Sequence, residues 1–314
     1  MKTNKQYLYT DIAGNDVCIM TYTYGEGADG LYVQGGVHGG EVTYYIFAEL
    51  HEFLKKNEMK LKKKVTLVPI ANPPAWNQRI YYYTVGKFDL YKGSDWNRSY
   101  PGGQTSLSAR NSQVLFEIAR KHEFVVDLHT ARNSMPYVIY MDSMVKDHVK
   151  EFGLPYNYYI DVSLKGNGKF KGTLNQALLE KGVNTFTCEC GSHDEYNENN
   201  VQMVYEGLLR LLENLNVIEE APPTNKAIEQ FVTEKIDVIY SPVSGFVKYY
   251  VKPWKNFSEG DLLCKILVSS ALGEQIDIRA PYDGVMFELA KTQITWVGDE
   301  LVRVIPSEAI STLE

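Results

Sequence analysis

Short runs rich in β-branched and aromatic residues alternate with longer amphipathic runs over the first two thirds of the chain. Runs of the first kind predict strands, and runs with apolar residues three and four positions apart predict helices. Such an alternation is typical of α/β folds, with a mostly parallel central sheet flanked by helices. The expected strands are 31–34, 65–70, 124–128, 137–141 and 184–188, and the expected helices are 43–56, 106–121, 173–181 and 201–215.

The helical pattern ends near EEAPPTN (219–225), and an internal repeat follows. One copy runs from SPVSGFV (241–247) to EGDLLCKI (259–266), and the other from APYDGVM (280–286) to VGDELVRV (297–304). A period of roughly forty residues indicates duplicated strand-and-turn units, as in a small β-sandwich or barrel. We therefore expect two domains, an α/β domain over residues 1–222 and a C-terminal β-domain over residues 235–314.

The repeat resembles the β-sandwich of biotinyl and lipoyl carriers, which raises the possibility of a swinging-arm function. In those carriers a lysine on an exposed hairpin between the two halves bears the prosthetic group. The corresponding connection here is SSALGEQ (269–275), which has no lysine. The sequence therefore argues against a carrier.

Charge and composition exclude several other classes of protein. The 32 basic and 39 acidic residues are scattered along the chain, and the formal charge of −7 offers no basic face for a nucleic acid. The N-terminus has no apolar segment of signal-peptide length, and no run approaches the roughly 18 uncharged residues that span a bilayer. We expect a cytoplasmic protein without nucleic-acid or membrane partners, whose four cysteines are reduced thiols.

The segment QGGVHGGEVTYY (34–45) places His38 and Glu41 three residues apart, directly after an expected strand. Ligands of α/β sheets bind at the carboxyl ends of strands, so this is a suitable position for chemistry. His-x-x-Glu alone is a weak signal, because a glycine turn with a glutamate at a helix N-terminus gives the same pattern. The segment by itself leaves both interpretations open.

A distant histidine, His129, ends the strand-like FVVDLHT, where residue alternation places it on the same side as Asp127. Two imidazoles and one carboxylate are the ligand set of hydrolytic zinc sites, which keep a fourth position for water. We therefore predict one Zn²⁺ per chain, bound by His38, Glu41 and His129. Asp127 either orients a ligand or satisfies backbone groups at the strand end. His193 has no partner at a suitable spacing, and we expect at most a supporting role for it.

Three further motifs carry groups suited to acyl transfer. Arg79 lies in NPPAWNQR, and Asn97 and Arg98 lie in DWNR. An arginine is a planar fork that binds a carboxylate or a developing oxyanion, although a single arginine is more often part of a surface salt bridge. Glu189 ends the apolar strand of TCECG, where a carboxylate is either a structural ion-pair member or a general base whose pKa burial has raised.

Taken in order, GGVHGGE, NPPAWNQR, DWNRSYPG, DLHT and TCECG resemble the succinylglutamate desuccinylase/aspartoacylase family of zinc-dependent hydrolases. The resemblance covers essentially the whole chain and implies a zinc carboxypeptidase-like fold. It implies that zinc is bound by His38, Glu41 and His129, that Arg79 polarises the scissile carbonyl, that Asn97 and Arg98 hold a substrate carboxylate, and that Glu189 is the general base and acid.

The sequence also departs from the family. The usual Asp-Leu-Asn-Arg is here Asp-Trp-Asn-Arg (95–98), and we find no counterpart of the extra arginine and late tyrosine with which aspartoacylase binds a second carboxylate. These departures argue against a substrate that resembles N-acetylaspartate.

The expected function is zinc-dependent hydrolysis of the amide bond of an N-acyl amino acid or a related small N-acyl amine. A metallocarboxypeptidase would use the same residues on a peptide, but would need an open cleft. A non-catalytic zinc-binding protein is less favoured, because it would have no need of Glu189 and both arginines. The sequence leaves the acyl group, the amine and homo-oligomer formation open.

Overall fold

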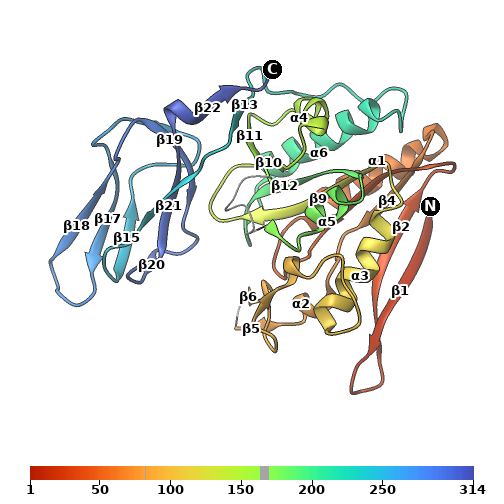
Figure 1. Cartoon of the computed structure of the whole chain (residues 1–314), viewed down its shortest axis with the longest axis horizontal. Coiled ribbons are helices and arrows are strands. Elements are labelled where there is room, and N and C mark those ends of the chain that lie inside the picture. Colours follow the sequence, from red (N-terminus) through yellow and green to blue (C-terminus); the bar gives the residue numbers. More distant parts are fainter. Residues whose placement is uncertain (82, 163–169) are drawn as a thin grey trace.

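The computed structural model describes residues 1–81, 83–162 and 170–314, and it confirms the α/β fold (Figure 1). A ten-stranded sheet forms its centre, in the order β1-β2-β4-β3-β9-β12-β10-β11-β13-β22. Its strands are β1 (Lys2–Thr10), β2 (Asp16–Tyr24), β3 (Asp29–Gly35), β4 (Lys64–Val68), β9 (Phe124–Ala131), β10 (Tyr137–Tyr140), β11 (Tyr156–Tyr159), β12 (Asn184–Ser192), β13 (Phe231–Thr233) and β22 (Ile310–Thr312).

The four central strands β4, β3, β9 and β12 run parallel. The side chains of β3, β4 and β9 are mostly buried, as expected for a sheet covered on both faces. All five strands expected from the sequence are present. The antiparallel β1–β2 hairpin at one edge and the short β11 near the other were not predicted.

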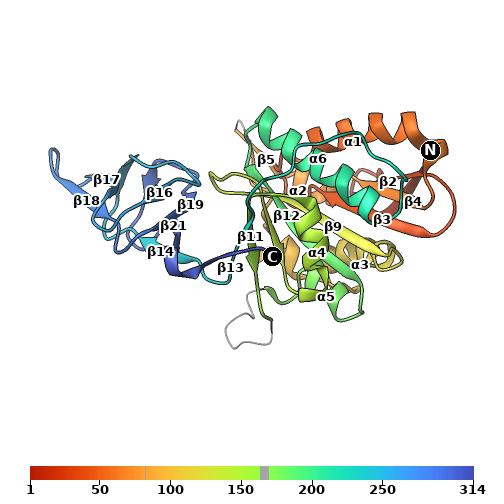
Figure 2. The same cartoon turned by 90° about the horizontal axis from the view of Figure 1, so that it is seen from above.

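Helices cover both faces of the sheet (Figure 2). One core cluster joins the sheet to α1 (Tyr44–Asn57), α4 (Lys146–Phe152) and α6 (Glu198–Asn214). The other cluster joins it to α2 (Pro73–Trp76), α3 (Leu107–Ala119) and α5 (Leu174–Leu179). The four helices expected from the sequence are α1, α3, α5 and α6, and their side chains close the core above and below the central strands.

Residues 237–306 form a separate β-unit of two four-stranded sheets around their own core. One sheet has the order β14-β21-β19-β16 and the other β18-β17-β15-β20. The strands are β14 (Asp237–Tyr240), β15 (Gly245–Tyr249), β16 (Asn256–Phe257), β17 (Leu262–Val268), β18 (Gln275–Arg279), β19 (Gly284–Leu289), β20 (Ile294–Thr295) and β21 (Glu300–Pro306). Two short hairpins, β5 (Arg79–Ile80) with β6 (Tyr83–Thr84) and β7 (Phe88–Asp89) with β8 (Ser94–Asp95), lie between α2 and α3.

The internal repeat seen in the sequence has a structural counterpart in the β-unit. Asp261 Oδ2 accepts a hydrogen bond from the Ser258 amide at 2.8 Å, and Asp299 Oδ2 accepts one from the Trp296 amide at 2.9 Å. The two Gly-Asp turns are therefore built in the same way. The β17–β18 hairpin, where a carrier would bear its lysine, points away from the α/β part of the chain (Figure 1).

The last strand of the chain leaves the β-unit. β22 pairs with β13 at the edge of the ten-stranded sheet, so the polypeptide enters and leaves the β-unit along this edge. The two parts also meet at a β-bridge, in which Leu289 donates to the carbonyl of Asn133 at 3.0 Å. No helix in the described ranges is long and apolar enough to cross a membrane.

Candidate metal centre and active site

Three neighbouring parallel strands deliver the predicted chemical groups to one edge of the sheet. β3 leads into the loop 36–41, which carries His38 and Glu41, while β9 carries His129 and β12 carries Glu189 opposite it. Gly36 and Gly40 allow the tight loop, since their φ angles of +67° and +91° lie in the left-handed region. The carboxyl ends of these strands are where α/β sheets usually bind ligands.

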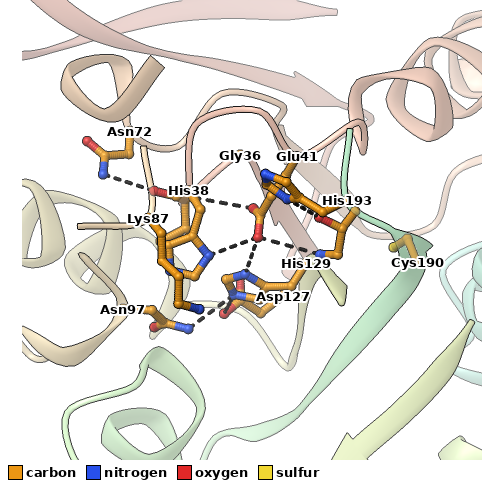
Figure 3. A network of polar contacts seen from close by, with 12 residues as sticks. Gly36, His38, Glu41, Asn72, Lys87, Asn97, Asp127, His129, Cys190 and His193 are labelled. Atoms are coloured by element: carbon orange, nitrogen blue, oxygen red, sulfur yellow. Dashed lines mark hydrogen bonds and ion pairs between the residues drawn. The ribbon is translucent and has the colours of Figure 1, made fainter. Parts of the chain in front are cut away.

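The two imidazoles converge on one carboxylate oxygen (Figure 3). Glu41 Oε1 lies 2.9 Å from His38 Nδ1 and 3.0 Å from His129 Nδ1. All three side chains are buried, and their three potential ligand atoms lie within 4.8 Å of one another. The structure therefore brings together the residues that the sequence analysis assigned to a metal.

The outer nitrogens of both rings are held by carboxylates. His38 Nε2 lies 3.0 Å from Asp95 Oδ1, and His129 Nε2 lies 3.0 Å from Asp127 Oδ2. Gln34 in turn donates to Asp127 Oδ1 at 2.9 Å. A carboxylate on Nε2 keeps the proton on that nitrogen and turns the lone pair of Nδ1 inward, as metal-binding histidines require. Of the two roles that the sequence allowed Asp127, its contact with His129 fits the orientation of a ligand.

Electrostatics hold this cluster in its charged form. Burial alone would raise the pKa of Glu41, but His129 and His38 lower the pKa well below its usual value. Burial would likewise lower the pKa of His129, but Asp127 and Glu41 raise it well above the usual value. Glu41 therefore stays ionised while the His129 ring keeps its second proton, and a metal ion bound here would have to displace that proton from the ring nitrogen.

Glu189 stands apart from these paired groups. Its Oε2 is inaccessible to solvent and has no hydrogen-bond partner in the described parts of the chain. Burial raises the pKa of Glu189 to about 7; the charge of His129 opposes this shift, whereas Glu288 and Glu41 add to it. A carboxyl group with a pKa near neutrality and a free oxygen is suited to accept and return protons.

Two cavities open beside the cluster. The larger, of about 490 Å³, extends from His38, Glu41 and Glu189 to the β-unit. The smaller, of about 100 Å³, is lined by residues that include Asn97, Arg98 and His129. His38, Lys87 and Glu189 line both cavities, so the cavities meet at these side chains.

The predicted substrate-binding pair lies within the smaller cavity. Asn97 is buried, and its Nδ2 lies 3.1 Å from His129 Nε2, while its Oδ1 accepts a hydrogen bond from the Leu174 amide at 3.3 Å. The Arg98 guanidinium donates to the Asn97 carbonyl and lies 3.9 Å from Asp95 Oδ2. Their assigned role as a carboxylate clamp stays a prediction.

Arg79 is placed differently from the other predicted residues. It lies on the β5–β6 hairpin, where it is exposed, and it is not among the residues that line either cavity. The structure therefore does not bring it to the cluster, and its role in polarising a carbonyl stays a prediction.

The sequence analysis missed Lys87 and Glu288, and it gave His193 at most a supporting role. Lys87 lines both cavities, and His193 lines the larger one with its Nδ1 2.9 Å from Thr130 Oγ1. The β-unit adds a buried carboxylate, Glu288, which accepts hydrogen bonds from Tyr137 at 2.7 Å and Arg303 at 3.2 Å. None of these residues has a diagnostic spacing, and only the position of Lys87 within VGK, after a glycine, could have drawn attention to it.

Comparison with known proteins places the fold and the family. The family model of the succinylglutamate desuccinylase/aspartoacylase catalytic domain matches residues 28–215. No curated protein matches the sequence.

Among solved structures, a protein described as a succinylglutamate desuccinylase/aspartoacylase from Shewanella frigidimarina NCIMB 400 superposes with a TM-score of 0.87 at 21% identity, covering 100% of this chain and 98% of the other. A family protein from Shewanella amazonensis SB2B gives 0.85 at 23% identity, covering 99% and 100%. The product-bound ectoine utilization protein EutE (DoeB) from Ruegeria pomeroyi gives 0.80 at 17% identity, covering 96% and 94%. Because the family model spans more than half of the sequence, this chain belongs to the succinylglutamate desuccinylase/aspartoacylase family, a family of hydrolytic deacylases.

Proposed function

We propose that the protein is a zinc-dependent amidohydrolase that removes the acyl group from an N-acyl amino acid or a related small N-acyl amine. The observation that carries this proposal is the meeting of two cavities at a two-imidazole, one-carboxylate cluster, beside a carboxyl group with an unpartnered oxygen. That arrangement supplies both a place for a metal and a proton-transfer group next to space for a substrate.

His38, Glu41 and His129 would hold one zinc ion through Nδ1, a carboxylate oxygen and Nδ1. Two nitrogens and one oxygen suit zinc, and three protein ligands leave it an open position. Zinc bound there would supply a Lewis acid that activates a water molecule and the amide carbonyl. Asp95 and Asp127 keep both rings in the required tautomer through contacts of 3.0 Å.

Glu189 moves the protons of the reaction. The Glu189 carboxylate takes a proton from the attacking water, and the protonated carboxyl then gives it to the leaving nitrogen as the C–N bond breaks. A pKa of about 7 suits both steps, because the group is then neither too weak a base nor too weak an acid at neutral pH. The products are a free carboxylate and a free amine.

Asn97 and Arg98 bind the carboxylate of the amino-acid part in the smaller cavity. An amide and a guanidinium together present several N–H donors to a planar carboxylate. The cavity volume of about 100 Å³ favours a small group at this position. The larger cavity, closed on one side by Glu288, Lys291 and Arg303 of the β-unit, holds the other part of a small substrate.

The test is hydrolysis by protein loaded with zinc, using a panel of N-acyl amino acids, their methyl esters and longer peptides, with release of free amine as the measurement. We expect about one zinc per chain, turnover of small N-acyl amino acids, and faster turnover of free acids than of methyl esters. Arg98→Lys should lose the preference for free acids over methyl esters, because an ammonium cannot reproduce the planar fork of the guanidinium.

Control variants separate the roles of the carboxylates. Glu189→Gln should retain zinc and lose activity by at least roughly a hundredfold, as is typical for general acid–base groups, whereas His129→Ala should lose zinc. Zinc loss in Glu189→Gln with zinc retention in Glu41→Gln would mean that the two roles are exchanged. If long peptides are cleaved as well as small amides, the metallocarboxypeptidase alternative becomes the better proposal.

A further inference from the structure

Amide hydrolysis places negative charge on the carbonyl oxygen, so a site for this reaction needs a fixed donor at that position. The family resemblance assigns this task to Arg79. The following inference rests on the proposed function and concerns which residue of this chain faces the carbonyl.

The scissile bond must reach the metal ligands and Glu189 at the same time. His38, Glu189 and Lys87 line both cavities, so we place the reacting carbonyl among them. Figure 3 shows the Lys87 side chain extending alongside His38 toward Asn97 and His129. Arg79 is exposed on its hairpin and lines neither cavity. We propose that Lys87 is the catalytic residue that donates a hydrogen bond to the carbonyl oxygen.

The backbone around Lys87 is fixed against the loop that carries the metal ligands. The Gly39 amide donates to the carbonyl of Gly86 at 3.0 Å, and the Trp96 amide donates to the carbonyl of Lys87 at 3.3 Å. A Cβ atom on Gly86 would lie only 2.5 Å from Gly39 N and Cα and from the Ala75 carbonyl oxygen. The close glycine contact therefore holds the Lys87 backbone next to His38, so that the side chain of Lys87 begins beside the metal ligands.

The ammonium group of Lys87 keeps some freedom. Its Nζ lies 3.7 Å from Asp95 Oδ2, too far for a direct hydrogen bond, and 61% of the side chain is exposed. Asp95 uses its other oxygen for His38. Lys87 can therefore approach a substrate without breaking a buried hydrogen bond. The alternative is that Lys87 only balances the charge of Asp95, and the experiment must separate these two roles.

The experiment compares Lys87→Met, Lys87→Arg and Arg79→Met with the control Lys92→Met, which changes an exposed lysine of the same loop region outside both cavities. With an N-acyl amino acid that the unmodified enzyme hydrolyses, Lys87→Met should lower kcat by about a hundredfold or more, the typical cost of losing one oxyanion donor. KM and zinc content should stay nearly unchanged. Lys87→Arg should retain part of the activity, and Arg79→Met and Lys92→Met should behave like the unmodified enzyme.

Two results would overturn the proposal. One is a loss of kcat in Arg79→Met but not in Lys87→Met. The other is a loss of zinc from Lys87→Met with unchanged kcat per bound zinc, which would show that Lys87 acts only through Asp95 on the metal ligands.

A binding measurement keeps this test independent of turnover. An N-(methylphosphonyl) amino acid mimics the charged tetrahedral state, and calorimetry should show at least about tenfold weaker binding to zinc-loaded Lys87→Met and no change for Arg79→Met. Weaker binding to Arg79→Met alone would contradict the assignment. The enzyme could also bind the phosphonate through Lys87 and yet hydrolyse no amide of the panel. That result would contradict the proposed function but not the placement of Lys87.

Discussion

At the scale of single residues, Glu189 differs from the carboxylates around it. Glu41, Asp95 and Asp127 each contact an imidazole, whereas Glu189 Oε2 has no partner within the described part of the structure. Burial disfavours the ionised form, and it outweighs the opposing charges of His129 and Lys87, so the pKa of Glu189 is raised to about 7. The neighbouring Glu288 adds to the shift, although it belongs to the β-unit.

The first prediction follows from the sign of this shift. A general base acts only when ionised, so kcat/KM should fall as pH drops through the pKa of Glu189, by about tenfold per pH unit in the limit of a single titrating group. Glu288→Gln removes a charge that raises the pKa of Glu189, and it should move this acidic limb to lower pH. The measurement is kcat/KM as a function of pH at constant ionic strength.

Glu300→Gln serves as the matched control. Glu300 also pairs with Arg303, at 3.0 Å, so both variants break an ion pair of the same arginine. We expect a shifted acidic limb only in Glu288→Gln. Equal shifts in both variants, or an unshifted limb in both, would show that Glu288 does not act electrostatically on Glu189.

At the scale of elements, the site depends on loops that pack closely at the ends of the strands. The loop 36–41 after β3 carries His38 and Glu41, and the segment 85–87 between β6 and β7 carries Lys87. The two segments touch through the Gly39 and Gly86 backbones. The contact requires a residue without a side chain at position 86, because neighbouring backbone atoms lie only 2.5 Å from where a Cβ would stand.

The second prediction tests this contact. Gly86→Ala should lower the free energy of unfolding by about 1–3 kcal/mol, as overpacking typically does, and it should also lower kcat because it displaces Lys87. Gly103→Ala is the control, since a Cβ there meets no atom within 4 Å and the φ angle is not in the left-handed region. Denaturant unfolding and turnover check both variants. A Gly86→Ala protein as stable and active as the control would argue against the contact.

At the scale of the whole molecule, the β-unit forms one wall of the larger cavity. Lys291 pairs with Asp194, Arg132 pairs with Glu300 at 2.7 Å, and the Asn133–Leu289 bridge joins the backbones. We expect a wall of this kind to exclude long peptides, to admit small amides and to limit the water around the reacting groups. Because β22 returns to the ten-stranded sheet, deletion of residues 235–314 would also remove a strand from that sheet.

The third prediction therefore uses a point change in place of a deletion. Lys291→Ala removes the ion pair to Asp194 and should raise the ratio of kcat/KM for a long peptide to that for a small N-acyl amino acid, with zinc content unchanged. Lys265→Ala is the control, because its ion pair to Asp277, at 3.4 Å, lies within the β-unit. An unchanged ratio in Lys291→Ala, or the same increase in the control, would argue against the idea that the Lys291–Asp194 pair holds the wall of the cavity in place.

Much of the candidate site could be predicted from the sequence, because its residues stand in short sequence patterns that can be recognised without the fold. His38 and Glu41 stand three apart in a glycine turn, and His129 and Glu189 each end an apolar strand. Parallel strands place their carboxyl ends at one edge, so local patterns were enough to bring these groups together. The fold class followed from the same alternation of strands and helices, whereas the edge strands β1 and β2, with their weaker apolar pattern, were missed.

Hydrophobic periodicity and short residue spacings are local properties of the chain, so they were enough to predict the fold class and the residues of the His38–Glu41–His129 cluster. The folded structure was needed to show that Lys87 and not Arg79 lies beside the cluster, that Asp95 contacts His38, and that Glu288 reaches the cavity from the β-unit. These contacts join segments far apart in the chain, or depend on how a loop turns. Their physical basis is the packing of backbones and charges across separate elements, which leaves no periodic pattern in the residues themselves.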